Sequence, residues 1–265
     1  MSIITIGEYV KPKSPQEAYD LLMSKKNSQL IGGGTYIHLG KKHIGLAIDL
    51  SDSEMEYINE TDTTIEIGAM TTFREIETNK ILSKYFDNLL SRSVENIVGV
   101  QLRNMVAVGS TVFSRYNFSD FITGLRVLDV KIVLIGGGEM TLDEFIDSER
   151  NRDLLEKIII KKEILRASFQ MMRNSMADYA ILNAAVSKGD KGFKIVVGAR
   201  PGIAVFATNA MEYINSCNEI NEETADKAGQ IASEELTFGT NVLGSKEYRT
   251  HIARVLVKSA ILEVV

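Results

Sequence analysis

Three consecutive glycines near the start of the chain could bring the backbone close to a phosphate group. Residues 32–34 follow a short apolar, strand-like run at residues 29–31. Because glycine has no side chain, successive N–H groups in such a turn can point at an anion. The run matches neither the Rossmann fingerprint nor the P-loop, since Ile37 replaces the third glycine and Lys41 is followed by Lys42. A simple turn after a strand stays open as the alternative.

A second stretch could contact the same ligand. Gly109, Ser110 and Thr111 offer one backbone N–H and two hydroxyl groups. Asp120, further along the chain, could accept hydrogen bonds from ribityl or ribose hydroxyls. The alternatives are that Ser110 and Thr111 form an ordinary loop and that Asp120 caps a helix beginning near Phe121.

Other chemistries find little support in the sequence. The three histidines, His38, His43 and His251, have no metal-binding spacing. Cys217 has no histidine nearby for nucleophilic catalysis. As the single cysteine, it cannot hold an iron–sulfur cluster, which takes about four thiolates. We expect no catalytic side chain and no metal ligand on this chain, so any metal centre would lie on another polypeptide.

Capping signals and apolar spacing predict the elements around these segments. Residues 1–50 predict a small β-α-β-loop-β unit, with its helix capped at Ser14. Thr72 opens a short helix through a capping box with an acid three residues later. The apolar spacing of residues 81–97 predicts another, continuous helix. Residues 136–138, glycines between two strand-like runs, predict a tight turn.

The carboxy-terminal part changes in character. Three strand-like runs occur at residues 168–172, 180–186 and 193–197. Two amphipathic helices follow, one starting near Asn221 and one capped by Ser245. Strands followed by helices indicate a separate α+β domain with a three-stranded antiparallel sheet. The expected domains are residues 1–163, with subdomains of about 1–55 and 56–163, and residues 164–265.

Composition limits the class of protein. The chain has 265 residues, 45% hydrophobic and 25% charged, with a formal net charge of -5 at pH 7. It lacks the clustered Lys and Arg that nucleic-acid binding needs. The first ten residues have no signal-peptide pattern, and no apolar run reaches the roughly 18 residues of a membrane span. We expect a cytoplasmic protein with no membrane and no nucleic-acid partner.

The order and spacing of several short segments resemble the FAD-binding subunit of the xanthine dehydrogenase and aerobic carbon monoxide dehydrogenase family of molybdenum hydroxylases. The resemblance runs over essentially the whole chain. Its anchors are residues 31–35, 68–72, 101–104, 108–109, 119–120, 177–180, 198–201 and 245–249. It implies an α+β fold in which two small α/β subdomains of the vanillyl-alcohol-oxidase (PCMH) type bind the flavin and a carboxy-terminal α+β domain follows.

The resemblance also implies which residues bind FAD. In this family two loops wrap the FAD pyrophosphate. The first loop would comprise Ile31, Gly32, Gly33, Gly34, Thr35, Tyr36, Ile37 and His38, and the second loop Val108, Gly109, Ser110 and Thr111. By position, Asp120 would hold the FAD, Leu155 would make an apolar contact and Tyr179 would shield the isoalloxazine ring.

Three places in the chain depart from the family pattern. The second loop of the family commonly has two glycines followed by Asn or Asp, whereas this chain has Ser110 and Thr111 after Gly109. These side chains either crowd the pyrophosphate or add hydroxyl bonds. Residues 115–118 replace the small residues and proline of the family, and Gln170 stands where some members carry a lysine contact.

The resemblance implies an electron-transfer subunit of a xanthine dehydrogenase-like oxidoreductase. A molybdenum-cofactor subunit would oxidise a substrate such as a purine or another N-heterocycle. An iron–sulfur subunit would pass the electrons to FAD, and an acceptor such as NAD would receive them. The alternatives are a stand-alone FAD-dependent reductase and a non-catalytic assembly subunit that has lost FAD.

Overall fold

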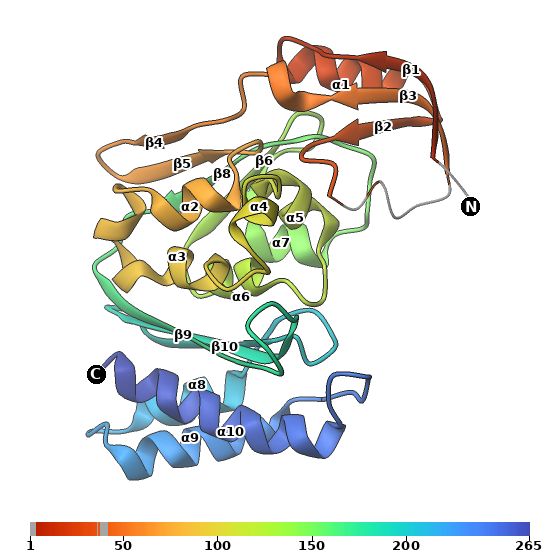
Figure 1. The fold of residues 1–265 in the computed structure, drawn as a ribbon. Helices are drawn as coiled ribbons and strands as arrows, with labels where there is room; N and C mark the ends of the chain where they lie inside the picture. The colour runs from red at the N-terminus through yellow and green to blue at the C-terminus, as the bar shows by residue number, and fades with distance from the viewer. Residues whose placement is uncertain (1–3, 36, 38–41) are drawn as a thin grey trace. The chain divides into compact units, whose positions relative to one another are not determined.

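The structure, a computed structural model, describes residues 4–35, 37 and 42–265. Backbone contacts divide the chain into two compact units, which are drawn together in Figure 1. The first unit comprises Met1–Glu75, Val100–Ser114 and Val130–Lys161, and the second comprises Ile76–Gly99, Arg115–Asp129 and Lys162–Val265. Each unit is therefore built from three separate stretches of chain. A domain boundary near residue 163 stays a prediction.

The first unit opens with a three-stranded parallel sheet and one helix (Figure 1). Its elements are β1 (Thr5–Val10), α1 (Pro15–Ser24), β2 (Ser28–Ile31) and β3 (His43–Asp49). β3 lies in the centre and pairs in parallel with both neighbours. The side chain of Ser14 accepts the N–H of Glu17, and Pro15 takes the first helical position. The predicted β-α-β-loop-β unit is confirmed.

A five-stranded antiparallel sheet completes the first unit, in the order β4-β5-β8-β6-β7. Its strands are β4 (Ile58–Glu60), β5 (Thr64–Gly68), β6 (Val130–Leu134), β7 (Gly138–Thr141) and β8 (Leu155–Lys161). The short helices are α4 (Val100–Arg103), α5 (Val108–Ser114), α7 (Leu142–Asp147) and α2 (Phe73–Thr78), which crosses the division between the units. A 3-10 turn, Leu50–Asp52, follows β3.

Two local predictions in this unit are confirmed. The N–H of Thr72 donates to Glu75 Oε2 at 2.7 Å, and the N–H of Glu75 donates back to the Thr72 hydroxyl at 3.2 Å. This reciprocal pair is the capping box that the sequence predicted. The glycines at 136–138 turn the chain between β6 and β7, which pair from Lys131 with Thr141 to Leu134 with Gly138.

The second unit contains a four-stranded antiparallel sheet in the order β12-β11-β10-β9. Its strands are β9 (Leu165–Arg173), β10 (Ala180–Gly189), β11 (Gly192–Gly198) and β12 (Val205–Phe206). Its helices are α3 (Leu89–Val94), α6 (Asp120–Arg126), α8 (Thr208–Ser216), α9 (Glu222–Glu235) and α10 (Lys246–Glu263). The predicted sheet is confirmed, and β12 adds a short edge strand to it. Both carboxy-terminal helices are capped as predicted, at Asn221 and Ser245.

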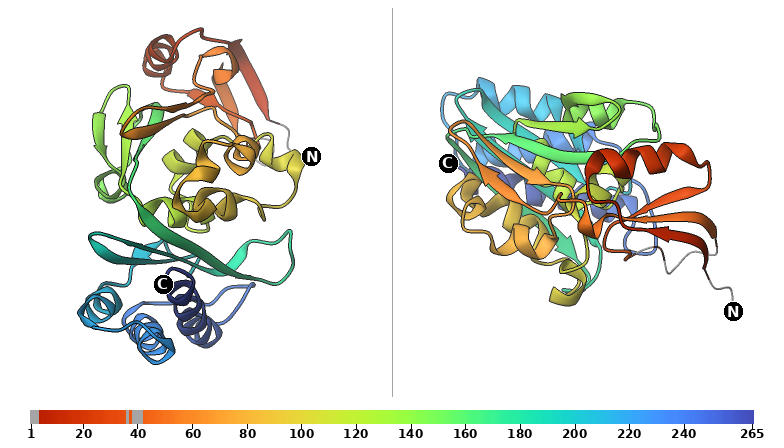
Figure 2. Two further views of the ribbon diagram at one scale, coloured as in Figure 1. Left: turned by 90° about the vertical axis from the view of Figure 1, so that its left-hand side faces the viewer. Right: turned by 90° about the horizontal axis from the view of Figure 1, so that it is seen from above.

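β10 is buried on both faces because helices cover both sides of it. Leu182, Ala184 and Val186 belong to the apolar core shared with α8, α9 and α10, which the left view of Figure 2 shows in blue beside the sheet. On the alternate positions, Asn183 bonds to Asp120 of α6, and the Ser187 hydroxyl donates to the Val127 carbonyl at 2.7 Å. Successive strand residues point to opposite faces, so α6 covers the second face.

The continuous helix predicted for residues 81–97 is wrong. The chain instead forms two 3-10 turns, Leu82–Lys84 and Phe86–Asn88, before α3 begins. The three residues of the second turn have left-handed φ values of 57°, 48° and 61°. Asp87 Oδ2 accepts Arg166 Nε at 2.6 Å and the Ala167 N–H at 3.1 Å, both on β9. These contacts favour a break that the apolar spacing of the segment does not reveal.

Candidate functional site

The glycine loop, residues 31–35, follows β2 and has a backbone that requires glycine at two positions, Gly33 and Gly34. A Cβ atom on Gly33 would lie 1.4 Å from the Met105 carbonyl oxygen, so the two backbones touch there. Gly34 has a φ of +69°, in the left-handed region that side chains rarely adopt. The Ile37 N–H donates to the Gly34 carbonyl at 3.2 Å and closes the turn. The glycines are therefore needed for close approach and for the turn itself.

Residues 108–111 form the first turn of α5, whereas the sequence suggested a loop. The Val108 N–H donates to the Thr71 carbonyl at 2.9 Å, and the Gly109 N–H donates to the Ala69 carbonyl at 2.7 Å. A Cβ atom on Gly109 would lie 2.6 Å from Ala69 Cβ. Gly109 thus lets α5 start directly against the segment that follows β5.

The structure brings the glycine loop and the start of α5 together. A Cβ atom on Gly32 would lie 3.6 Å from Ala107 Cβ, 3.7 Å from Met70 Sδ and 3.9 Å from Ser110 Cβ. These are ordinary van der Waals distances, so a methyl group there would fill space between the two segments without a clash. The N–H groups of Val108 and Gly109 already donate within the protein, so a pyrophosphate at this surface would rely on the backbone of the glycine loop and on the small side chain of Ser110.

The two residues of the second loop that depart from the family pattern, Ser110 and Thr111, both bond to the residue just before α5. The Ser110 hydroxyl donates to the Ala107 carbonyl at 2.8 Å, and the Thr111 hydroxyl donates to the same oxygen at 3.2 Å. Ser110 is exposed, while Thr111 is buried. Only the Ser110 side chain is therefore available at the surface beside Gly32.

The remaining expected residues of this unit lie in different environments. Tyr36 and His38 lie outside the described residues. Leu155 begins β8, is buried and pairs with Leu134 in the core of the five-stranded sheet. Its contact with a cofactor stays a prediction.

Asp120, in the second unit, is not the helix cap that the sequence left open. Ser119 caps α6 by accepting the Ile122 N–H. The Asp120 carboxylate is buried instead, where Arg173 Nη2 donates to Oδ2 and Asn183 Nδ2 donates to Oδ1 at 2.5 Å. Burial raises the pKa of Asp120, and the Arg173 guanidinium beside it opposes that rise.

Tyr179 is half exposed and belongs to a small aromatic cluster of the second unit. Its ring lies 4.6 Å from the Phe118 ring, centroid to centroid, at a tilted angle of 54°. Phe118 in turn stacks on Tyr116 at 5.0 Å with an interplanar angle of 12°. Phe118, in the 115–118 segment that departs from the family pattern, therefore packs on the residue expected to shield the flavin, and Tyr116 packs behind Phe118.

Arg173 and Asn183 are partners of Asp120 that the sequence did not predict. Both are far from Asp120 in the chain, and neither belongs to a recognisable motif. Arg173 is the last residue of the mostly apolar strand β9. A buried charge needs a partner, so a charged residue at this position was the one sequence signal that could have indicated a buried ion pair.

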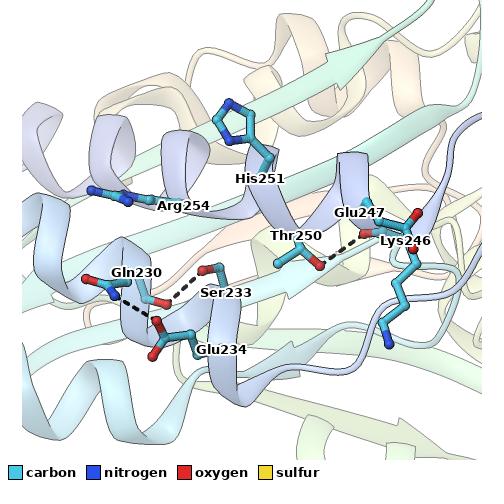
Figure 3. A pocket seen from close by; sticks show the side chains of 8 residues that line it. All are labelled: Gln230, Ser233, Glu234, Lys246, Glu247, Thr250, His251 and Arg254. Carbon is cyan, nitrogen blue, oxygen red and sulfur yellow. Dashed lines mark hydrogen bonds between the residues drawn. The ribbon is translucent and has the colours of Figure 1, made fainter.

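A surface pocket between α9 and α10 contains none of the expected residues (Figure 3). It is lined by Gln230, Ser233, Glu234, Lys246, Glu247, Thr250, His251 and Arg254. Gln230 Nε2 donates to Glu234 Oε1 at 2.7 Å and the Ser233 hydroxyl to the Gln230 carbonyl at 2.7 Å, as on an ordinary solvated helix surface. Among the residues that the structure describes, no cluster of three or more His, Cys, Asp and Glu could hold a metal ion. Nor does that part of the chain contain a helix long and apolar enough to cross a membrane.

Two family models match the chain in succession. The model described as the FAD binding domain in molybdopterin dehydrogenase matches residues 4–165. The model described as the carbon monoxide dehydrogenase flavoprotein C-terminal domain matches residues 167–264. Together they cover both the glycine loop and the carboxy-terminal sheet with its helices.

Curated relatives and solved structures are similar over long stretches. The nicotinate dehydrogenase FAD-subunit of Eubacterium barkeri is 29% identical over 60% of this chain and 57% of that protein, so the match spans little more than half of it. The glyceraldehyde dehydrogenase medium chain of Sulfolobus acidocaldarius is 23% identical over 97% of both chains. In quinoline 2-oxidoreductase from Pseudomonas putida 86, a chain matches with a TM-score of 0.90 and 20% identity, over 100% of this chain and 98% of that one. In carbon monoxide dehydrogenase from Hydrogenophaga pseudoflava, a chain matches with a TM-score of 0.89 and 22% identity, over 100% of this chain and 98% of that one. The structural likeness shows that the fold is shared.

Proposed function

Because this chain belongs to the family of FAD-binding proteins of the molybdopterin dehydrogenases, we propose that it is the electron-transfer subunit of a multi-subunit molybdenum hydroxylase. FAD is its cofactor, and membership of the family confirms both the fold class and the cofactor expected from the sequence. The subunit would carry electrons from iron–sulfur clusters through FAD to an acceptor such as NAD. When bound, FAD can accept electrons singly and release them in pairs.

The residues that would hold FAD are those of the glycine loop and the start of α5. Gly32, Gly33 and Gly34 are partly exposed, and Ser110 lies beside Gly32. Their task would be to bind the pyrophosphate and to fix the orientation of the cofactor, since the redox chemistry belongs to the flavin. We therefore assign no general acid or base to this chain.

The source and the acceptor of the electrons would lie outside this chain. Cys217 is its single cysteine, so the iron–sulfur clusters would be bound by a partner subunit. A further subunit would hold the molybdenum cofactor and the substrate. The names of the relatives, an FAD-subunit and a medium chain, support such an assembly. The cytoplasmic location and NAD as the acceptor remain predictions.

The observation that carries the proposal is the apposition of Gly32 and Ser110, and a single methyl group tests it. Gly32→Ala would place that methyl at ordinary contact distances within the protein, so the fold should stay stable. Within the pyrophosphate surface the same methyl would cost about 1–3 kcal/mol, or roughly tenfold to hundredfold in FAD affinity. FAD titration followed by absorbance, together with thermal unfolding of the apoprotein, measures both effects.

Gly138→Ala is the control variant. Gly138 has a φ of +72° in the β6–β7 turn, and nothing lies within 4 Å of the added Cβ. Strain there should cost about 1 kcal/mol of stability without changing FAD affinity. Equal FAD binding by wild type and Gly32→Ala would contradict the placement of the pyrophosphate. A folded wild-type chain that binds no FAD, even with its partner subunits present, would favour the assembly-subunit alternative.

A further inference from the structure

Within the first unit, Arg152 reaches from the connection between α7 and β8 to the turn between α1 and β2. Its Nη1 donates to the Lys26 carbonyl at 3.1 Å, and its Nη2 donates to the Lys25 carbonyl at 2.7 Å. Nη2 also donates to the carbonyl of Ser28 at 3.3 Å and to the Ser28 hydroxyl. Four acceptors around one turn therefore converge on a single guanidinium group, whose planar fork suits several acceptors at once.

The backbone beside Arg152 is fixed to the five-stranded sheet. Asp153, the next residue, is 8% exposed, and its Oδ1 accepts the Gly136 N–H at 2.9 Å and the Leu154 N–H at 2.7 Å. The Leu154 carbonyl in turn accepts the Ile135 N–H at 2.9 Å. The side chain of Arg152 thus starts from a fixed point beside the end of β6 and the start of β8, and it links that point to the three-stranded sheet.

β2 connects the contact of Arg152 to the glycine loop. Ser28 is the first residue of β2, Ile31 is its last, and Gly32 follows directly. Four residues of extended chain span only about 13 Å. Among the described strands, β2 pairs with β3 alone, along one edge. A short strand with few bonds of its own opens easily, so a contact that holds its first residue also helps to fix the loop after its last.

The other side of the expected pyrophosphate site is built on the five-stranded sheet. The Gly109 N–H at the start of α5 donates to the Ala69 carbonyl at 2.7 Å, and the Ala69 N–H donates to the Glu156 carbonyl of β8 at 2.9 Å. The apposition of Gly32 and Ser110 therefore depends on how the two sheets of this unit are held together. The glycine loop meets α5 beyond one end of β2, and Arg152 holds the other end.

We infer that Arg152 is a positioning residue of the FAD pyrophosphate site, because it holds β2, and with it the glycine loop, at a fixed place relative to the start of α5. This inference rests on the proposed function for the presence of a pyrophosphate between the two segments. Preorganised groups bind a ligand more tightly because less freedom is lost on binding. A lysine ammonium carries its donors on one atom, so it reaches only part of the acceptors that the guanidinium group reaches.

The test compares Arg152→Ala and Arg152→Lys with Arg254→Ala in the full-length chain. Arg152 is exposed, so its truncation leaves no internal cavity and the chain should still fold. Arg254 is the matched control because it also bridges two elements, from α10 to Asp226 of α9, but in the second unit.

Three quantities are measured on each variant. They are the hydrogen–deuterium exchange of residues 28–34 without ligand, the affinities for FAD and for ADP, and the temperature of unfolding. ADP serves as the second probe because it carries a pyrophosphate without the flavin. The temperature of unfolding separates a local effect on the glycine loop from a general loss of stability.

We expect Arg152→Ala to speed exchange across residues 28–34 by about tenfold, because the charge-assisted hydrogen bonds that hold β2 are lost. The affinities for FAD and for ADP should fall together, each by about tenfold, since both ligands use the glycine loop. Arg152→Lys should restore both affinities to within about threefold of wild type. Arg254→Ala should change neither the exchange of residues 28–34 nor either affinity, and both alanine variants should lower the temperature of unfolding by no more than about 4 °C.

Three results would overturn the inference by itself. Unchanged exchange in Arg152→Ala would show that the arginine does not restrain β2. A loss of affinity for FAD without a loss for ADP would show that Arg152 acts away from the pyrophosphate. Equal losses of affinity in Arg254→Ala would show a general loss of stability in place of a local effect.

A failure of the proposed function would look different. A wild-type chain that binds neither FAD nor ADP would overturn that function and with it the role of Arg152 toward a pyrophosphate. Faster exchange of residues 28–34 in Arg152→Ala would even then establish that the arginine restrains β2.

Discussion

At the scale of single residues, Ser110 shows how the chain accommodates a departure from the family pattern. A serine stands where glycine is common, beside a surface expected to receive a pyrophosphate. Its hydroxyl donates back at 2.8 Å to the carbonyl of Ala107, the residue just before its own helix. A small side chain that bonds locally can remain next to Gly32 without filling the space that a phosphate needs.

Charge at this position should be far more disruptive than size. Ser110→Asp places a carboxylate beside the expected pyrophosphate, and repulsion at an effective dielectric constant of about 20 costs roughly 1–3 kcal/mol. We expect FAD affinity to fall by about tenfold to hundredfold, and the loss to shrink as salt is raised. Ser110→Ala should change affinity less than about threefold. Titration of FAD at two salt concentrations measures these effects.

Ser24→Asp is the matched control for this charge. Ser24 is also exposed, and its hydroxyl donates to the carbonyl three residues earlier, as that of Ser110 does. It should leave FAD affinity unchanged. Equal losses in Ser24→Asp and Ser110→Asp would mean that net charge, and not a local contact, determines binding.

At the scale of elements, the end of α10 is fixed to β9 and α3 through Glu263. Its carboxylate accepts hydrogen bonds from Arg92, from the Ser168 hydroxyl and from Gln170 Nε2, the last at 2.7 Å. Burial raises the pKa of Glu263, but the hydrogen bonds from Arg92 and Ser168 and the charge of Arg92 outweigh it and lower the pKa overall. Gln170, one of the positions expected to depart from the family pattern, thus bonds to the last helix in this chain.

Glu263→Gln should therefore destabilise the protein in a pH-dependent way. A carboxyl whose pKa is lowered by folding stabilises the folded state above its unfolded pKa, near 4.5, and loses that effect as the pH falls through the lower folded pKa. We expect a loss of about 1–2 kcal/mol in the free energy of unfolding near pH 7, which diminishes below about pH 4.5. Denaturant unfolding at a series of pH values measures it.

The control is Glu234→Gln, an exposed carboxylate on α9 that accepts a hydrogen bond from Gln230. It should change the free energy of unfolding by less than about 0.5 kcal/mol. A destabilisation by Glu263→Gln that stays constant down to the lowest pH would show that packing, not the charge, is responsible.

At the scale of the whole molecule, the second unit depends on segments that precede residue 164. α6 lies within residues 115–129 and covers one face of the sheet formed by β9 to β12. Phe121, Ile122 and Leu125 of α6 are at most 1% exposed. Asn183 and Ser187 of β10 take their hydrogen-bond partners from the same stretch of chain.

A fragment of residues 164–265 should consequently fail to form a stable, monomeric domain. Without α6, the face of β10 that carries Asn183 and Ser187 would be exposed, and the buried polar groups of these two residues would lose their partners, each at a cost of about 1–3 kcal/mol. We expect aggregation in gel filtration, binding of a hydrophobic dye and no cooperative thermal transition. A monomeric fragment with a sharp transition would show instead that residue 163 marks a true folding boundary.

The sequence by itself determined those features that depend on near neighbours in the chain. The caps at Ser14, Thr72 and Ser245 involve residues three positions apart, and the glycine turn at residues 136–138 needs only the flexibility of its own backbone. The ordered set of short motifs was also sufficient to identify the family and its cofactor, because a shared fold preserves their spacing.

Only the tertiary structure decided what depends on residues far apart in the chain. The left-handed break at Phe86–Asn88 is bonded to β9 across 79 sequence positions, and Asp120 meets Arg173 across 53. The assignment of α6 to the carboxy-terminal sheet likewise comes from non-local packing. Burial of apolar surface and pairing of buried charges select such contacts from many possible ones, and neither local propensity nor periodicity reports which partner will be chosen.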